Sequence, residues 1–252
     1  MKPDRLTGVE VAGAPGVELR GIVRRYAGAN GDVVALDGVD AAFPAGTFTV
    51  VAGPSGSGKT TLLRLVALLD RPERGHVLLG GVDVTIVSPR ERRLLRRRYV
   101  GYMFQQPGDN LLEYLSADEH VRLGYRLRAA HPTTNADLLD VLGLADRVTH
   151  RPAHLSGGEQ QRLAFAFAAA GAPRLLVADE PTAALDHAAG ARVVDALRAL
   201  ADRGVTVVAS SHDPAVVAAA GSVIRIAHGR IADEPEPSAG EPEPSADESE
   251  PS

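Results

Sequence analysis

The stretch that decides the fold is Thr47-Phe48-Thr49-Val50-Val51-Ala52-Gly53-Pro54-Ser55-Gly56-Ser57-Gly58-Lys59-Thr60-Thr61, followed by the apolar run Leu62 to Leu69. It predicts a β-branched strand, a glycine-rich loop and a helix, and in that setting G-x-x-x-x-G-K-[ST] indicates a phosphate-binding P-loop. The glycines let backbone N–H groups turn toward phosphate oxygens, and the helix start adds its positive dipole end. We expect residues 53–61 to bind a nucleotide, with Lys59 on its terminal phosphates and the Thr60 hydroxyl on Mg²⁺.

Composition supports a globular protein with a sizeable core. The chain has 252 residues, 44% of them apolar, and no cysteine. Disulfides, thiolate metal sites and cysteine nucleophiles are therefore excluded. Residues 1–17 lack the basic-then-apolar order of a signal peptide, and no apolar run approaches the length of a membrane span. We expect the chain not to cross a membrane by itself.

Charge is unevenly distributed along the chain. Residues 233–252 hold eight of the 32 acidic residues and none of the 27 basic ones, so residues 1–232 carry 27 basic against 24 acidic residues, a net charge of +3. This near-neutral balance gives no basic field for nucleic acid, and no nucleic-acid partner is expected. The acidic segment contains Glu-Pro-Glu-Pro-Ser-Ala twice and no core-forming residue, which predicts a disordered tail with a solubilising or spacer role.

The chain is predicted to have three parts: a lead-in at residues 1–16, an α/β domain at residues 17–232 and the acidic tail at residues 233–252. Residues 1–16 form a loose lead-in, and alternating patterns at residues 17–23 and 33–39 predict an antiparallel hairpin before the P-loop. Further strands are expected at 76–79, 99–104, 205–209 and 222–227, and helices at 89–98 and 187–203. The helical pattern from Ser116 to Leu155 predicts an inserted helical subdomain at about residues 109–165. The six arginines of residues 89–98 are interpreted as a solvated helix face.

Tyr26 and His212 are weaker candidates for the nucleotide site. Tyr26 lies at the hairpin turn, where its ring has the shape to stack on a nucleotide base; the alternative is a tyrosine half-buried against the sheet. His212 follows an apolar strand, at the edge where ligands bind in open α/β sheets; the alternative is a structural histidine.

A second glycine-rich helix start follows the helical region. Leu155-Ser156-Gly157-Gly158-Glu159-Gln160-Gln161-Arg162 opens a helix with Ser156 as a good N-cap, and the two glycines expose N–H groups to an anion. One nucleotide has one γ-phosphate. Two such devices therefore indicate either two anions or a site shared between two copies of the chain.

Two acids end the apolar strand Arg174-Leu175-Leu176-Val177-Ala178-Asp179-Glu180-Pro181. In a P-loop protein, Asp179 at this position is expected to hold Mg²⁺. Glu180 points to the other side of the chain, where it is placed to polarise a water in line with the γ-phosphate. The alternative is a solvated strand end.

The order of these parts resembles the ATP-binding subunits of ABC transporters, over about residues 17–232. The motifs that carry the resemblance are Gly-Pro-Ser-Gly-Ser-Gly-Lys-Thr-Thr (53–61), Leu-Ser-Gly-Gly-Glu-Gln-Gln-Arg (155–162), Leu-Leu-Val-Ala-Asp-Glu-Pro-Thr (175–182), Ala-Leu-Asp (184–186) and Ser-His-Asp (211–213). The sequence Val-Gly-Tyr-Met-Phe-Gln-Gln around Gln105 is most similar to the lipoprotein-releasing and macrolide-export type. The expected fold is a RecA-like P-loop NTPase core with an N-terminal antiparallel β subdomain and an inserted α-helical subdomain.

The resemblance implies a head-to-tail dimer, either a homodimer or a pairing with a related ATPase subunit, that binds two ATP molecules. Ser156, Gly157 and Gly158 of one copy would cap the γ-phosphate held by the other copy's P-loop. By the same resemblance, Tyr26 stacks on adenine, Gln105 reaches Mg²⁺, Asp186 contacts the opposing subunit, and His212 steadies the γ-phosphate and the attacking water. The partner would be an integral membrane permease, which would hold the chain on the cytoplasmic face of the membrane.

The sequence departs from the family at several positions. Thr60 replaces a serine, Phe167 replaces a common arginine, Glu113 replaces a frequent proline, and the loop after Gln105 is longer. The connection from Arg128 to Asp137 is also shorter than usual. This connection, Glu113 and the longer loop lie where a membrane partner is expected, so they leave its identity open. Three alternatives also remain: the same ATPase regulating a non-transport membrane complex such as a cell-wall hydrolase, a soluble ABC protein acting on ribosomes or DNA, and a P-loop kinase.

Overall fold

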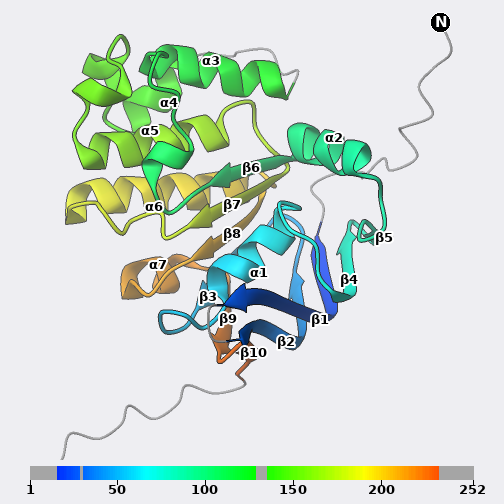
Figure 1. Cartoon of the computed structure of the whole chain (residues 1–252). Coiled ribbons are helices and arrows are strands. Elements are labelled where there is room, and N and C mark those ends of the chain that lie inside the picture. Colours follow the sequence, from blue (N-terminus) through cyan, green and yellow to red (C-terminus); the bar gives the residue numbers. More distant parts are fainter. Residues whose placement is uncertain (1–15, 29–30, 129–134, 233–252) are drawn as a thin grey trace, which may run out of the picture.

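A computed structural model describes residues 16–28, 31–128 and 135–232. The expected lead-in, apart from Gly16, and the expected acidic tail lie outside these residues. The described chain contains two sheets with helices around them (Figure 1). No helix among the described residues is long and apolar enough to cross a membrane.

The smaller sheet is antiparallel and lies next to the P-loop. Its strand order is β2-β1-β4-β5, formed by β1 (Val17–Gly28), β2 (Gly31–Phe43), β4 (Arg74–Leu79) and β5 (Val82–Asp83). The expected hairpin is confirmed, but its strands are longer than the alternating patterns predict. Register shifts along β1 break the two-residue alternation, and Gly21 adopts a positive φ of 58° at one of them.

The larger sheet supplies the core and has the order β10-β9-β3-β8-β7-β6. Its strands are β3 (Phe48–Ala52), β6 (Val100–Met103), β7 (Leu175–Asp179), β8 (Thr206–Ser210), β9 (Ser222–Ala227) and β10 (Arg230–Ile231). Five of them are parallel neighbours, and β10 is antiparallel to β9. The central strands β3, β7 and β8 are almost fully buried, as expected for parallel strands covered on both faces.

Helices cover the two faces of this sheet. On one face, α1 (Lys59–Val66) packs with the antiparallel sheet into an apolar cluster that contains Leu62, Leu65 and Val208. On the other face, α5 (Gly157–Ala169), α6 (His187–Asp202) and α7 (Pro214–Ala219) enclose a second cluster. The fold class expected from the sequence is confirmed.

The segment between β6 and β7 contains helices and short turns in its described residues and no strand. It holds α3 (Ala117–Leu127), α4 (Asn135–Val141) and α5, with 3₁₀ turns η1 (Pro107–Asp109), η2 (Ala145–Arg147) and η3 (Pro152–His154). Ser116 and Glu119 form a capping box that fixes the start of α3. These helices form the upper layer in Figure 1.

The arginine-rich helix α2 (Pro89–Tyr99) corrects one expectation. Four of its arginines are exposed, but Arg92 is only 4% exposed and is not part of a solvated face. Its Nε donates to the carbonyl of Leu68 at 2.8 Å, so the guanidinium binds a carbonyl just beyond the end of α1. Burial, together with the nearby charges of Arg71 and Arg96, lowers the pKa of Arg92 to about 10. The helical periodicity of residues 89–98 did not predict this contact, because its partner, Leu68, lies in a separate segment of the chain.

Candidate functional site

A cavity of about 620 Å³ lies at the carboxyl ends of β3, β7 and β8. Residues 53–56 and 58–61 of the P-loop line it, together with residues 33–35 of β2 and Ala183. Four polar side chains complete the wall: Gln105, Asp179, Glu180 and His212. This is the edge at which open α/β sheets bind ligands.

The P-loop glycines are required by the backbone at two positions. A Cβ on Gly53 would lie 2.1 Å from the carbonyl oxygen of Ile226, and one on Gly58 would lie 2.4 Å from that of Ala35. Gly58 is also the N-cap of α1, at a φ of 107°, and it has no side chain with which to cap the first N–H groups of the helix. Those N–H groups and the dipole end of α1 are therefore available to an anion.

Lys59 is curled back over the same loop. Its Nζ donates to the carbonyl oxygens of Gly53 at 2.8 Å and Pro54 at 2.9 Å. These contacts hold the ammonium group at the wall of the cavity. A phosphate group in the cavity would thus meet both the ammonium charge and the backbone donors.

Asp179 ends β7 as a buried carboxylate held by the neighbouring strand. It is 2% exposed, and its Oδ1 accepts a hydrogen bond from Ser210 Oγ at 2.6 Å. The same Oγ accepts from the backbone N–H of Glu180 at 2.9 Å. Ser210 therefore fixes both acids, and the sequence analysis did not single it out. Its one signal in the sequence is its place at the end of an apolar strand, directly before Ser211-His212.

Glu180 and His212 face each other across the strand ends. The Nδ1 of His212 lies 3.1 Å from a carboxylate oxygen of Glu180. Glu180 is 8% exposed, whereas the imidazole is 74% exposed, so the acid is enclosed and the histidine borders solvent. Glu180 has a φ of 48°, a left-handed conformation that costs a non-glycine residue about 1–3 kcal/mol. This turn separates its carboxylate from that of Asp179.

Three oxygen-bearing side chains in the cavity suit a hard divalent cation. Thr60, Gln105 and Asp179 offer a hydroxyl, a carboxamide and a carboxylate from α1, the end of β6 and the end of β7. Asn110 fixes the chain next to Gln105, because its side chain accepts from the N–H of Phe104 and donates to the carbonyl of Tyr102, both at 2.8 Å. The donor types therefore fit Mg²⁺.

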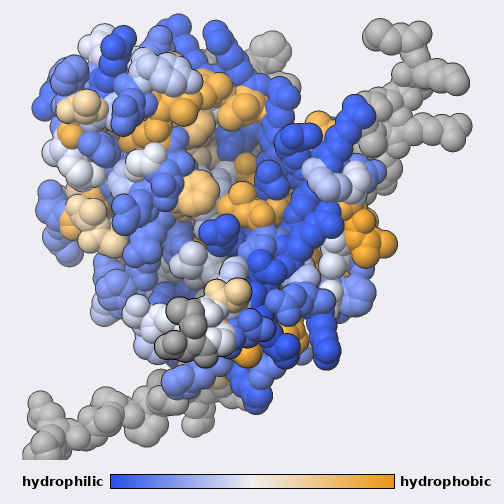
Figure 2. All heavy atoms as spheres, viewed as in Figure 1, coloured by the Kyte–Doolittle hydropathy of each residue, from blue (hydrophilic) through white to orange (hydrophobic). Residues whose placement is uncertain are grey.

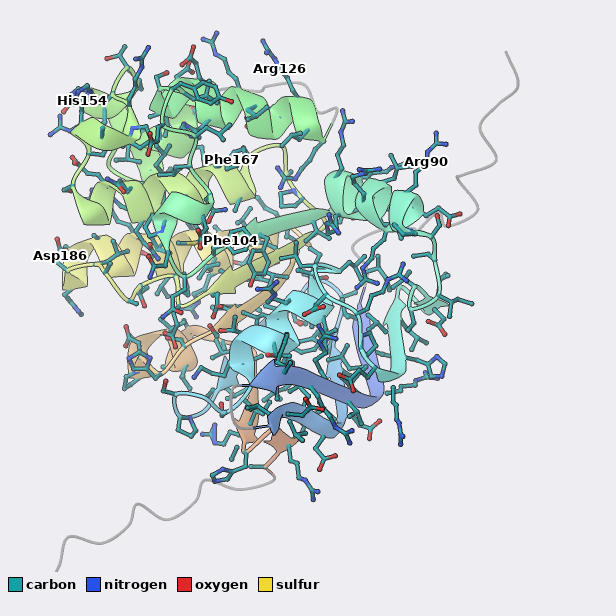
Figure 3. All side chains as sticks on the ribbon, viewed as in Figure 1. Arg90, Phe104, Arg126, His154, Phe167 and Asp186 are labelled. Atoms are coloured by element: carbon teal, nitrogen blue, oxygen red, sulfur yellow. The ribbon has the colours of Figure 1, made fainter. Side chains whose placement is uncertain are left out.

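Several predicted site residues do not line this cavity in the described chain. Ser57 is buried. Tyr26 donates a hydrogen bond from its hydroxyl to Asp70. Its partner on the neighbouring strand, Val33, does line the cavity. Asp186 caps α6 by accepting from the N–H of Ala189 at 2.8 Å (Figure 3). The Ser156-Gly157-Gly158 turn lies at the start of α5, outside the cavity.

The glycines of that turn are not required by their own chain. A Cβ on Gly157 would meet nothing within 4 Å, and one on Gly158 would make an ordinary contact of 3.5 Å with Leu185. Ser156 caps α5, with its Oγ accepting from Glu159 N and its own N–H donating to Glu159. The helix start is therefore preformed, and room for close approach remains on its outer side.

The fold and the cavity define a P-loop nucleotide-binding protein. The profile of the ABC transporter family matches residues 36–183. The chain therefore belongs to the ABC transporter family.

Individual relatives agree with this assignment. The chain is 42% identical over 227 residues to a macrolide export ATP-binding/permease protein, MacB, of Nitrosomonas europaea, covering 86% of this chain and 33% of the relative. It is 35% identical to the uncharacterized ABC transporter ATP-binding protein MJ1508 of Methanocaldococcus jannaschii, covering 86% of this chain and 98% of that one. The chain spans about a third of the length of the MacB-type relatives.

A solved structure shows the same fold. The dimeric structure of a post-hydrolysis state of the ATP-binding cassette MJ0796, bound to ADP and Pi, matches with a TM-score of 0.79. The match has 32% identity and covers 85% of this chain and 96% of that chain. Both the ligands and the dimer are properties of that protein.

Proposed function

We propose that this chain hydrolyses ATP as half of a head-to-tail dimer and that the dimer drives a separate membrane permease. The observation that carries the proposal is the incomplete cavity. It contains the P-loop, both acids and His212, while the Ser156-Gly157-Gly158 turn starts a helix outside it. A second copy would bring its own turn to this cavity, and the dimeric form of the matched cassette supports that arrangement.

Within one half-site, the residues take distinct roles. The P-loop N–H groups and Lys59 bind the phosphates, while Thr60, Gln105 and Asp179 would hold Mg²⁺. When bound, Mg²⁺ would neutralise negative charge on the phosphate oxygens. Asp186, at the outer end of α6, contacts the opposing copy. This assignment of Mg²⁺ rests on the oxygen donor set of the cavity.

Glu180 is the residue placed to accept a proton. A water attacks the γ-phosphorus in line with the bond to the bridging oxygen, that bond breaks, and ADP and inorganic phosphate form. Glu180 takes the proton that the water loses, and the 3.1 Å contact with His212 orients its carboxylate. His212 is largely exposed and also lines the cavity, and we assign it to steady the γ-phosphate. Because Glu180 is enclosed, its proton transfer is directed toward the cavity.

Mixing two inactive variants tests whether the site is shared. Lys59→Ala removes the P-loop cation, and Ser156→Arg blocks the α5 turn; each variant alone should lose turnover. In a mixed dimer, the Ser156→Arg chain supplies an intact P-loop and the Lys59→Ala chain an intact turn, so one of the two sites is restored. Mixing Lys59→Ala with Glu180→Gln is the control, since both residues belong to the same half-site and no intact site forms. Failure of the first mixture to regain ATPase activity would contradict the shared site.

The permease surface is the second part of the proposal. A smaller cavity of about 210 Å³ lies at the end of β6. Its lining includes the aromatic residues Tyr102, Phe104 and Phe167 and the polar residues Asp109, Asn110 and Arg128. Figure 3 labels Phe104 and Phe167. Figure 2 shows hydrophobic side chains gathered on the part of the surface formed by the helical layer of Figure 1. Leu112 and Tyr114, in the segment before α3, are exposed. A hollow near Gln105 with both aromatic and charged lining residues suits a short segment of a membrane protein whose movement must reach the nucleotide site.

The relatives that this chain matches over about a third of their length are named ATP-binding/permease proteins, and those names support a permease partner. Such a permease would hold the chain at the inner face of the membrane. Co-purification with a multi-span membrane protein encoded beside this chain tests the pairing. Phe167→Glu should abolish it, whereas Ile86→Glu, at a side chain that is 84% exposed elsewhere, should not.

A further inference from the structure

Tyr26 is held by two charged residues that lie outside the nucleotide cavity. Its hydroxyl donates to Oδ2 of Asp70 at 2.8 Å, and the Arg24 guanidinium lies 4.7 Å from the centroid of its ring. Arg24 also pairs with Oδ1 of Asp70 at 3.1 Å. The ring is therefore fixed at its hydroxyl edge and covered on one face by a cation.

Asp70 is itself fixed relative to the P-loop helix. It follows α1, and its N–H donates to the carbonyl of Arg64 at 3.1 Å in the last turn of that helix. Its Oδ1 accepts from the N–H of Arg71 at 2.9 Å, and its carbonyl accepts from the buried Arg92. Burial alone would raise the pKa of Asp70, but the Tyr26 hydrogen bond, the Arg71 N–H and the charge of Arg24 lower it below its usual value. The Asp70 carboxylate is thus a fixed hydrogen-bond acceptor in the segment that directly follows α1, the helix whose first residue is Lys59.

The Tyr26 side chain is partly exposed and belongs to the hairpin that supplies one wall of the cavity. Tyr26 is 37% exposed, and its Cα is paired across the hairpin with Val33, which lines the cavity wall. A nucleotide with its phosphates in the P-loop must place its base toward this hairpin side or into solvent. A flat aromatic face at that place matches the flat face of a purine.

We propose that Asp70, together with Arg24, is a positioning residue that holds the free face of Tyr26 ready to stack on the base of ATP. The inference rests on the proposed function, since it assumes that the cavity binds a nucleotide. It adds that α1 sets the position of both ends of the ligand: Lys59 at its start meets the phosphates, and Asp70 beyond its end fixes the ring for the base. Loss of the Asp70 carboxylate should therefore weaken recognition of the base and leave recognition of the phosphates unchanged.

The test compares ATP with inorganic tripolyphosphate, which has the phosphates but no base. Stacking of a base on an aromatic ring is worth about 1–3 kcal/mol, so Tyr26→Leu should weaken ATP binding by about 5- to 150-fold. Asp70→Ala and Tyr26→Phe should each weaken it several-fold, and none of the three should change the Kd of tripolyphosphate. In turnover, Asp70→Ala should raise KM for ATP with kcat unchanged. Asp70→Asn keeps the size of the side chain and should show the same trend if the alanine variant folds poorly.

The double variant separates positioning from a general structural effect. Once Tyr26 is leucine, Asp70→Ala should weaken ATP binding no further, because the group that it positions is gone. Asp37→Ala is the matched control: it removes an acid of the same hairpin that pairs with Arg230 at 2.6 Å, and it should leave both Kd values unchanged.

Equal losses for ATP and tripolyphosphate, additive effects in the double variant, or wild-type chain that binds ATP no tighter than tripolyphosphate would each overturn the inference. None of these results would change the outcome expected of the mixed-dimer experiment. Failure of that experiment with an intact ATP preference would instead count against the proposed dimer alone.

Discussion

The hydroxyl of Ser210 lies 2.6 Å from Oδ1 of Asp179, and through this contact the end of β8 sets the direction of the carboxylate that ends β7. The two residues are paired in register between the parallel strands. Because one carboxylate oxygen is engaged by Ser210, the other is left for the cavity. The same hydroxyl accepts the N–H of Glu180, so one side chain orients the proposed cation ligand and anchors the backbone of the proposed proton acceptor.

Ser210→Ala should therefore affect both stability and cation use. Removing the hydroxyl leaves a buried carboxylate and a buried N–H without their partner, which costs about 1–3 kcal/mol in the free energy of unfolding. Denaturant unfolding measures that loss, and the Mg²⁺ concentration for half-maximal turnover should rise. Thr206→Val is the control: it removes a buried hydroxyl at the other end of β8, where Gly46 is the donor, and it should lower stability without changing Mg²⁺ dependence. An unchanged Mg²⁺ dependence in Ser210→Ala would contradict the orienting role.

Glu180→Gln should bind ATP and turn it over very slowly. The carboxamide keeps the size of the side chain and the strained φ of 48°, but it cannot take a proton from water. Loss of a positioned base lowers a rate by about 10²–10⁴-fold. Nucleotide binding by fluorescence and phosphate release in a single turnover measure the two properties separately. Glu113→Gln, at an exposed glutamate outside the cavity, is the control. Turnover within a few-fold of wild type would assign the base to another residue.

Most of the site was predictable because its residues follow apolar strands. Asp179 ends such a strand, Gly53 and His212 closely follow one, and parallel strands bring their carboxyl ends to one edge. Contacts that depend on the order of the strands were not predictable. Ser210 meets Asp179 only because β8 lies beside β7, and Tyr26 meets Asp70 only because β1 crosses the end of α1. Neither pair shares a local pattern in the sequence.

In the helical region, too, contacts between separate segments were not predictable from the sequence. Its periodicity predicted helices, yet it did not show that His120 is fully buried and bonded to the loop that follows Gln105. That contact is again between segments, with the N–H of Leu112 donating to Nε2 of His120 at 2.9 Å.

Stability should fall in mild acid because of His120. Its Nε2 accepts from Leu112, its Nδ1 lies 2.7 Å from the carbonyl of Ser116, and burial lowers its pKa below the usual 6.5. The unfolded chain takes up a proton near pH 6.5, whereas the folded chain resists it, so the unfolded state binds more protons below that pH. The free energy of unfolding should therefore decrease as the pH falls from about 6.5 toward the lowered pKa of the folded state, and the contribution of this group should be constant below that value.

Thermal unfolding at a series of pH values measures this effect. His120→Gln should have a shallower dependence of Tm on pH between 7.5 and 5.5 than wild type, whatever its Tm at neutral pH. His154→Gln removes an exposed imidazole on η3 instead and serves as the control. Identical slopes for wild type and His120→Gln would show that His120 does not cause the acid sensitivity.

Gly157→Ala should leave the fold intact and reduce activity. The added Cβ meets nothing within 4 Å in its own chain, and alanine is the better helix former, so Tm should stay the same or rise slightly. In the proposed dimer, however, that methyl group would lie where the γ-phosphate of the other copy's ATP approaches the start of α5. An N–H donor to a reacting oxyanion is worth about 10²–10³-fold in rate, so partial displacement should lower turnover by about tenfold or more. It should also weaken the Mg·ATP-dependent dimer of the Glu180→Gln variant in sedimentation.

The control is Gly190→Ala on α6, the same substitution at a site outside the proposed contact. Its Cβ would lie 3.9 Å from Thr182, and turnover should be unchanged. Full turnover in Gly157→Ala would mean that no ligand bound by a second copy comes close to this helix start. The glycine at position 157, which nothing in its own chain requires, would then have no role in catalysis.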